Sequence, residues 1–276
     1  PYIVIQTANH IIEAVDGGKL TDKDDADAKA LMGQVRAEAL VLRAMATFDL
    51  TRIYGKPYTE DNGASLGVPL VTNVISASEK PSRSTVAECY AQVLKDLNEA
   101  INSGNLSKKP EVGYMGLYAA KALLSRVYLT KGDWANALST AEDVINNSGK
   151  NLWTADEYVD AWKKDDKNHN NEMLFELSVT NNKDWNDREG IAYLYAENRP
   201  DIAGYGDVCA TKSFVKLLAQ DSLDVRANVF LAPYSDKKKV FNGARVYLNK
   251  MPAANGDVRY ANIPMPVSYT HLTLPT

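Results

Sequence analysis

One apolar face runs through residues 26–54 and constrains the fold more than any other feature of the sequence. Its members are separated by gaps of four, four, three, four, four and three residues: Leu31, Val35, Ala39, Leu42, Ala46, Leu50 and Ile53. That spacing is the period of one face of an α-helix. Leu40 and Phe48 widen the face, so we expect a long helix that is buried on more than one side and ends before Gly55 and Pro57.

A long connection, residues 56–84, separates this helix from the next one and is rich in proline, glycine and serine. Connections of this length are uncommon in compact domains and often serve a function. The next helix has a clear start, because Thr85 and Glu88 have the spacing of a capping box. Its apolar positions then follow helical gaps: Val86, Tyr90, Val93, Leu97 and Ile101.

The segment KGDWANAL, residues 131–138, predicts a turn between two further helices. Gly132 can adopt the left-handed conformation of a helix C-cap, and Asp133 can cap the helix that follows. The apolar positions before the turn are Leu117, Ala120, Leu124 and Val127, and those after it are Trp134, Ala137, Leu138, Ala141, Val144 and Ile145. We expect an αα-hairpin with the spacing of a tetratricopeptide repeat, in which a buried Trp134 covers the turn.

The pattern changes after residue 150. The segment EMLFELSV places Met173, Phe175, Leu177 and Val179 at alternate positions, which predicts a strand. Residues 181–266 are rich in Asn, Asp, Gly, Tyr and Pro, and TKSFVKLLAQ is their one good helical stretch. We therefore expect a mostly α fold, with tetratricopeptide-like helical hairpins in a single irregular domain that has long loops and a few short strands.

Three parts are expected within this domain. Residues 1–180 would form the helical scaffold, and residues 181–267 would form a loop-rich region that packs on it and binds the ligand. Residues 268–276 show no clear helical period and resemble translated vector sequence, so we expect a non-native tail there. The chain begins within a helical pattern and without Met, so we expect the natural N-terminus to lie upstream.

Composition argues against several classes of function. The formal net charge is −4 and no basic stripe is present, which argues against a nucleic-acid partner. No nucleophile elbow, glycine-rich phosphate loop or Cys/His metal cluster occurs, so we expect no catalytic residues, no metal site and no cofactor. Cys89 is expected to be a buried apolar filler, and a disulfide between Cys89 and Cys209 is left open.

Several segments resemble the SusD/RagB family and occur in the order that the family shows. They are EALVLRAMATFDLTRIYGKPY, TVAECYAQVLKDLNEAI, AAKALLSRVYLTKGDWANALSTAEDVI, NEMLFEL and ANIPMPV, and together they cover most of residues 1–267. The resemblance implies a single SusD-like domain.

The resemblance also implies a function. Members of this family are lipoproteins of the outer membrane, exposed at the cell surface, that capture oligosaccharides and cover a SusC-like TonB-dependent transporter. They are not enzymes. Their contact with the membrane is expected only through an N-terminal lipid anchor that this chain lacks, and neither Cys89 nor Cys209 can take that role.

Sugar binding requires exposed aromatic rings beside polar side chains, because pyranose rings have apolar faces and polar rims. The segment from Asn181 to Asp207 fits that requirement best. The candidate glycan-binding residues in it are Trp185, Asp184, Asn186, Arg188, Tyr193, Tyr195 and Tyr205. The alternative for the aromatic residues is that they attach the loops to the helices. Family binding residues follow no fixed motif, so the resemblance assigns none of these positions.

Two other functions are weighed against the glycan-binding one. A tetratricopeptide-like scaffold would bind a protein or peptide in its helical groove and would be indifferent to Trp185. A hydrolase is the weakest alternative, because no pair of carboxylates can be selected from the sequence alone. The glycan hypothesis predicts salt-insensitive binding of a neutral oligosaccharide that is lost in Trp185→Ala.

Overall fold

The computed structural model describes residues 1–19, 25–163, 172–177, 191–195, 198–199, 202–227, 246–247 and 263–266. The chain divides into two compact units, Pro1–Gly149 and Lys150–Pro266. The expected boundaries at 180 and 267 stay predictions, because residues 178–190 and 267–276 lie outside the described residues. The fold is mostly helical with a few short strands, as the sequence predicts.

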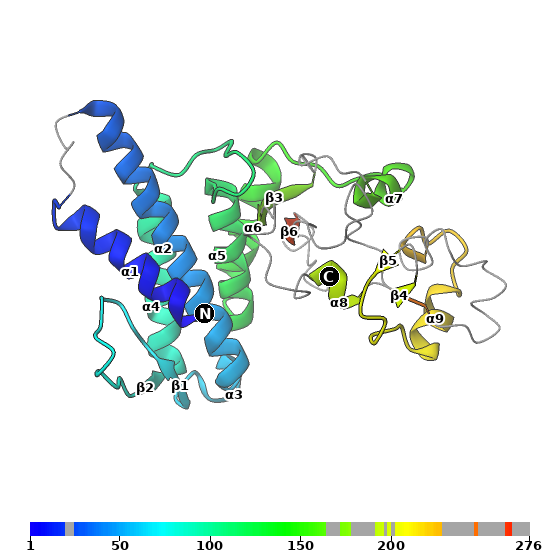
Figure 1. The fold of residues 1–276 in the computed structure, drawn as a ribbon, viewed down its shortest axis with the longest axis horizontal. Coiled ribbons are helices and arrows are strands. Elements are labelled where there is room, and N and C mark those ends of the chain that lie inside the picture. The colour runs from blue at the N-terminus through cyan, green and yellow to red at the C-terminus, as the bar shows by residue number, and fades with distance from the viewer. Residues whose placement is uncertain are drawn as a thin grey trace. The chain divides into compact units, whose positions relative to one another are not determined.

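The first unit is built from five long helices that follow one another through the chain. They are α1 (Tyr2–Asp16), α2 (Ala26–Tyr54), α4 (Val86–Asn102), α5 (Leu117–Lys131) and α6 (Trp134–Asn147). Figure 1 shows α1, α2, α4 and α5 lying side by side. The long connection after α2 is not structureless, because it contains the short helix α3 (Tyr58–Asp61) and the antiparallel pair β1 (Leu66–Pro69) and β2 (Arg83–Thr85).

Helix α2 confirms the predicted long helix but buries only the middle of the predicted face. Ala39, Ala46 and Leu50 are buried, whereas the predicted members at the ends, Leu31, Val35 and Ile53, are 60%, 40% and 68% exposed. The reason is length: α2 has 29 residues, and its neighbours α1 and α4 have 15 and 17. At 1.5 Å per residue α2 is roughly 43 Å long, so its ends extend beyond the helices that cover its centre.

Helix α4 begins as the sequence predicts. The Thr85 hydroxyl accepts a hydrogen bond from the Glu88 amide at 3.2 Å, and the Glu88 carboxylate accepts one from the Thr85 amide at 2.7 Å. The Thr85 amide, together with the Thr85 hydroxyl, which donates to the same carboxylate at 2.9 Å, holds the pKa of the exposed Glu88 carboxyl below its ordinary value. Cys89 is fully buried, as expected, and both Cys89 and Cys209 are free thiols.

The predicted hairpin of α5 and α6 is present, but Trp134 does not cover it. Gly132 caps α5 with φ +84°, and the Ser125 hydroxyl donates to the Ala137 carbonyl at 2.8 Å. Small residues on the inner face of α6 allow this close approach, which leaves the bulky side chains outside. Trp134, Leu138 and Ile145 are therefore 56%, 47% and 39% exposed, contrary to the prediction that they form the buried returning face.

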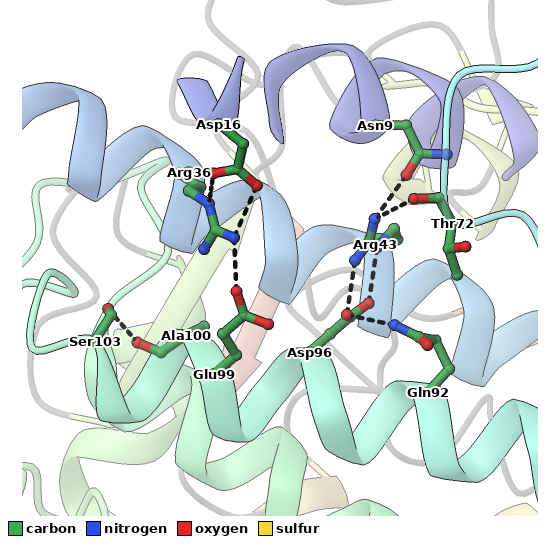
Figure 2. Close-up of polar contacts among 10 residues, drawn as sticks. All are labelled: Asn9, Asp16, Arg36, Arg43, Thr72, Gln92, Asp96, Glu99, Ala100 and Ser103. Carbon is green, nitrogen blue, oxygen red and sulfur yellow. Dashed lines mark hydrogen bonds and ion pairs between the residues drawn. The ribbon is translucent and has the colours of Figure 1, made fainter. Parts of the chain in front are cut away.

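A buried polar network connects α1, α2 and α4 (Figure 2). The Arg43 guanidinium donates to both carboxylate oxygens of Asp96, at 2.8 and 2.7 Å. It also donates to the Asn9 side-chain oxygen at 2.9 Å and to the Thr72 carbonyl at 3.0 Å. Gln92 donates to Asp96 at 2.7 Å. Arg43 and Asp96 are only 6% and 1% exposed, so the pair stabilises the unit only while both charges remain bonded.

A second, more exposed ion cluster joins the same three helices near the C-terminal end of α1. Arg36 on α2 donates to Asp16 at 2.6 Å and to Glu99 on α4 at 2.6 Å. The two carboxylates raise the pKa of the Arg36 guanidinium above its ordinary value, against the effect of partial burial. Together the two arginines connect α1, α2 and α4 at separate levels along α2.

The second unit has shorter elements. Its helices are α7 (Ala155–Lys163), α8 (Ile191–Tyr195) and α9 (Lys212–Leu218). The strand β3 (Met173–Leu177) pairs antiparallel with β6 (Ile263–Pro266), and β4 (Asn198–Arg199) pairs with β5 (Ile202–Ala203). The predicted strand and the predicted helix at TKSFVKLLAQ are thus confirmed.

The burial of β3 differs from the predicted alternation. Leu174 and Glu176 are buried as well as Met173 and Phe175, and Leu177 is 44% exposed. The strand is therefore covered on both of its faces. A strand in that position loses the apolar and polar alternation of a half-exposed one.

Gly63 and its control Gly104 test how closely the turn between α3 and β1 approaches the start of α4. Gly63 has φ +76°, and an added Cβ would lie 2.8 Å from the Ala87 main-chain nitrogen, whereas Gly104 has φ +73° and no atom within 4 Å of such a Cβ. Gly104→Ala should reduce the free energy of unfolding by about 1–2 kcal/mol, the cost of a left-handed L-residue. Gly63→Ala should reduce it further, because the clash is with main chain. Urea denaturation followed by circular dichroism measures both, and equal losses would contradict the predicted clash.

The buried network is tested by removing its cation. Arg43→Met should lower the free energy of unfolding by about 3–5 kcal/mol, because it leaves Asp96 buried and unpaired. Arg52→Met is the matched control on the same helix, since Arg52 pairs with the exposed Asp49, and it should cost about 1 kcal/mol or less. The double variant Arg43→Met, Asp96→Met should recover much of the loss in chemical denaturation. A cost for Arg43→Met no larger than that for Arg52→Met would contradict this role.

Candidate functional site: a tyrosine cluster

A tight reversal of the chain brings two of the predicted tyrosines together. Tyr193 lies in α8, and the chain then forms the β4–β5 pair, in which Asn198 faces Ala203 and Arg199 faces Ile202. The reversal returns the chain to α8, where the Tyr205 amide donates to the Tyr193 carbonyl at 3.1 Å. A two-strand reversal therefore positions Tyr205 against a helix that ends ten residues before it.

The two rings meet edge to face. Their centroids are 5.0 Å apart and their planes are at 87°. Tyr193 is 8% exposed, whereas Tyr205 is 40% exposed and Tyr195 is 37% exposed. This arrangement is a preferred one for aromatic pairs. Tyr193 thus supports the Tyr205 ring from inside the unit, and Tyr195 and Tyr205 present aromatic surface to solvent.

The segment after Tyr205 is held by residues much later in the chain. The Tyr247 hydroxyl donates to the Gly206 carbonyl at 3.2 Å, and the Ala210 amide donates to the Val246 carbonyl at 2.7 Å. Val246 is buried against Val215 of α9. The exposed Tyr205 therefore lies on a segment fixed at both ends, by α8 on one side and by residues 246–247 on the other.

Helix α9 and the turn after it are held by short-range polar bonds. Thr211 caps α9 by accepting from the Phe214 amide at 3.2 Å. After the helix, Arg226 donates to both carboxylate oxygens of Asp224, which lowers the pKa of Asp224 below its ordinary value. The Arg226 side chain is 67% exposed and that of Asp224 is 14% exposed, so one partner is largely solvated and the pair orders the turn more than it stabilises the unit.

Two buried carboxylates on and beside β3 hold the start of the second unit. Glu172 and Glu176 are 5% and 4% exposed, and Glu172 accepts from the Trp153 amide at 3.1 Å. Burial lowers the pKa of Lys150, and the negative charge of Glu176 opposes that shift. These acids therefore have structural partners in the segment at 150–153.

The structure describes three of the seven residues that the sequence singles out. Tyr193, Tyr195 and Tyr205 are placed as above, with Tyr193 and Tyr205 in direct ring contact. Asp184, Trp185, Asn186 and Arg188 lie outside the described residues. Tyr247 was missed by sequence reasoning, and no local signal could have found it, since it lies 41 residues from the carbonyl that it binds.

The chemistry that the described cluster offers is binding through aromatic faces and tyrosine hydroxyls. Among the residues that the structure describes, no group of three or more His, Cys, Asp and Glu side chains could hold a metal ion. In the same part of the chain, no helix combines the length and the apolar character that a membrane crossing requires.

Comparison with known proteins relates the chain to one family. The family described as starch-binding and associating with the outer membrane matches residues 1–129. A SusD-like protein of Bacteroides ovatus is 32% identical over 183 residues, which are 62% of this chain and 30% of that protein.

Two solved structures resemble nearly the whole chain. A protein of Bacteroides vulgatus is 39% identical with a TM-score of 0.84, over 98% of this chain and 57% of its own. A SusD superfamily protein of Bacteroides thetaiotaomicron is 34% identical with a TM-score of 0.85, over 98% of this chain and 59% of its own. The chain thus spans less than two thirds of the length of these relatives. It is similar in sequence to SusD-like proteins, and its mostly helical fold is that of the SusD superfamily.

Proposed function

We propose that this chain binds an oligosaccharide at the cell surface and delivers it to a SusC-like TonB-dependent transporter in the outer membrane. The observation that carries the binding step is the pair of exposed rings, Tyr195 and Tyr205, on a segment fixed by Tyr193 and Tyr247. The family match over residues 1–129 supports the setting, since that family is described as starch-binding and associating with the outer membrane.

The chemistry of the cluster favours a carbohydrate. Stacking one pyranose face on a tyrosine removes about 50 Å² of apolar surface from water, which is worth about 1 kcal/mol at about 25 cal/mol/Å². One ring therefore binds weakly, and useful affinity requires several contacts. Asp184, Trp185, Asn186 and Arg188 remain the proposed source of further contacts from the neighbouring segment.

Relatives of this fold support the same class of ligand. The Bacteroides vulgatus protein at 39% identity is described as a candidate sugar-binding protein. The matching family is described by binding and not by catalysis, in line with the expectation that the chain is not an enzyme. Delivery to a transporter, attachment through an N-terminal lipid and surface exposure are proposed from the resemblance to SusD/RagB proteins.

The binding proposal predicts a selective effect of Tyr205. A glycan array with the purified chain identifies the oligosaccharide, and isothermal titration then measures its affinity. Tyr205→Ala should weaken binding about five- to tenfold, because it removes one stacked ring. Tyr205→Phe should keep most of the affinity, because it keeps the ring.

Tyr114→Ala is the matched control, since Tyr114 is a 53% exposed tyrosine of the first unit. It should leave the affinity unchanged. Equal affinities of the Tyr205→Ala and Tyr114→Ala variants would place the binding site elsewhere. Added salt should have little effect if the ligand is neutral, because no charge pair is then screened.

A further inference from the structure

The main chain of residues 70–75, which together with Pro69 we name the strap, is bound by side chains and not by other main chain. Within residues 25–163, where the structure is continuous, no main-chain group of residues 70–75 pairs with another main-chain group. The strap nevertheless lies partly buried, with Val71 only 7% exposed. Buried main-chain groups need partners, so the groups that bind the strap determine whether it stays in place.

One face of α1 supplies most of those partners. Tyr2, Gln6, Asn9 and Glu13 recur at gaps of four, three and four residues, which places them along one face of the helix. The Tyr2 hydroxyl donates to the Pro69 carbonyl at 3.0 Å, and the Gln6 amide group donates to the Ile75 carbonyl at 3.0 Å. The Glu13 carboxylate accepts from the Val74 amide at 2.6 Å.

Asn9 and Arg43 bind the middle of the strap. The Asn9 side-chain amide donates to the carbonyls of Val71 and Asn73, at 3.3 and 2.8 Å. Arg43 donates to the carbonyl between them, that of Thr72, at 3.0 Å (Figure 2). Every residue from Val71 to Ile75 therefore has a main-chain group bonded to a side chain of α1 or α2.

Apolar side chains of the strap add anchors to these polar bonds. Val71 is buried in a cluster with Ile5, Leu50 and Cys89, and Ile75 packs against the same cluster. Proteins bind extended peptides by hydrogen bonds to the main chain of the peptide, combined with pockets for a few of its side chains. Here the bound peptide belongs to the same chain.

We propose that α1 and α2 form a peptide-recognition groove that the strap occupies as an intramolecular ligand, so that the groove is closed to peptides in trans. The groove recognises main chain through Gln6, Asn9, Glu13 and Arg43 and anchors Val71 and Ile75 in its apolar part. This inference goes beyond glycan binding and does not depend on it. The strap would also block the groove in which a tetratricopeptide-like scaffold could bind a peptide partner.

The test uses the full chain and a version in which residues 70–75 are replaced by an equally long Gly-Ser segment. A fluorescein-labelled peptide with the sequence of residues 66–77 serves as the probe in fluorescence anisotropy. It should bind the replaced chain and not the intact chain. Glu13→Leu in the replaced chain should weaken binding about tenfold or more, and Glu13→Gln, which keeps an acceptor, should weaken it less. A peptide with Asp in place of the two apolar anchors should not bind.

Each result decides the proposal. A replaced chain that keeps its helical circular dichroism but does not bind the peptide overturns it, and so does equal binding by the intact chain. If the replaced chain does not fold, hydrogen exchange in the otherwise intact chain decides. The Val74 amide should then exchange about fivefold faster or more in Glu13→Leu than in Glu13→Gln, and equal exchange overturns the proposal.

Discussion

The ion pair between Arg43 and Asp96 is the interaction on which the first unit depends most. It joins α2 to α4 where the two helices pack together, in a place where either charge alone would be strongly unfavourable. Apolar packing could hold α1, α2 and α4 together in several rotations. A buried, two-bond pair allows only the rotation in which the guanidinium faces the carboxylate, so it selects one arrangement from those that packing permits.

The same guanidinium also connects the helices to the connection that follows α2. Its remaining donor groups reach Asn9 and the Thr72 carbonyl, and Asn9 in turn binds the carbonyls on either side. A loss of the pair would therefore affect both the helix packing and the strap. This explains how residues 70–75, for which no main-chain bond is found among the described residues, can remain ordered against the helices.

Sequence reasoning succeeded where the signal is local. The capping box at Thr85 and Glu88 and the left-handed Gly132 each depend on residues within one turn of a helix, and the structure confirms both. Periodicity also located the long helices. It failed for Trp134 and Ile53, because a period shows which residues share a face but not how much of that face a neighbour covers.

The candidate site was less accessible to sequence reasoning for a related reason. An aromatic-rich segment indicates a binding region. It does not show which rings are exposed to a ligand and which are buried beneath them. Tyr193 is flanked by Ala192 and Leu194, and Tyr205 by Gly204 and Gly206, and neither setting shows that the β4–β5 reversal makes Tyr193 the buried support of Tyr205. Tyr247 was invisible because a hydrogen bond to a main-chain carbonyl leaves no pattern in the sequence around it.

The two units are held together by different kinds of contact. This difference determines where substitutions can change a ligand site without loss of stability. The first unit uses a fully bonded buried charge network, in which nearly every change leaves a buried group without its partner. The tyrosine cluster of the second unit uses a ring contact and single hydrogen bonds near the surface. A substitution at Tyr205 alters the exposed aromatic surface and removes its ring contact with Tyr193, but it leaves the main-chain bond to Tyr193 and the Tyr247 bond to Gly206 in place. Substitutions in the tyrosine cluster can therefore change the proposed glycan site without destabilising the helical unit.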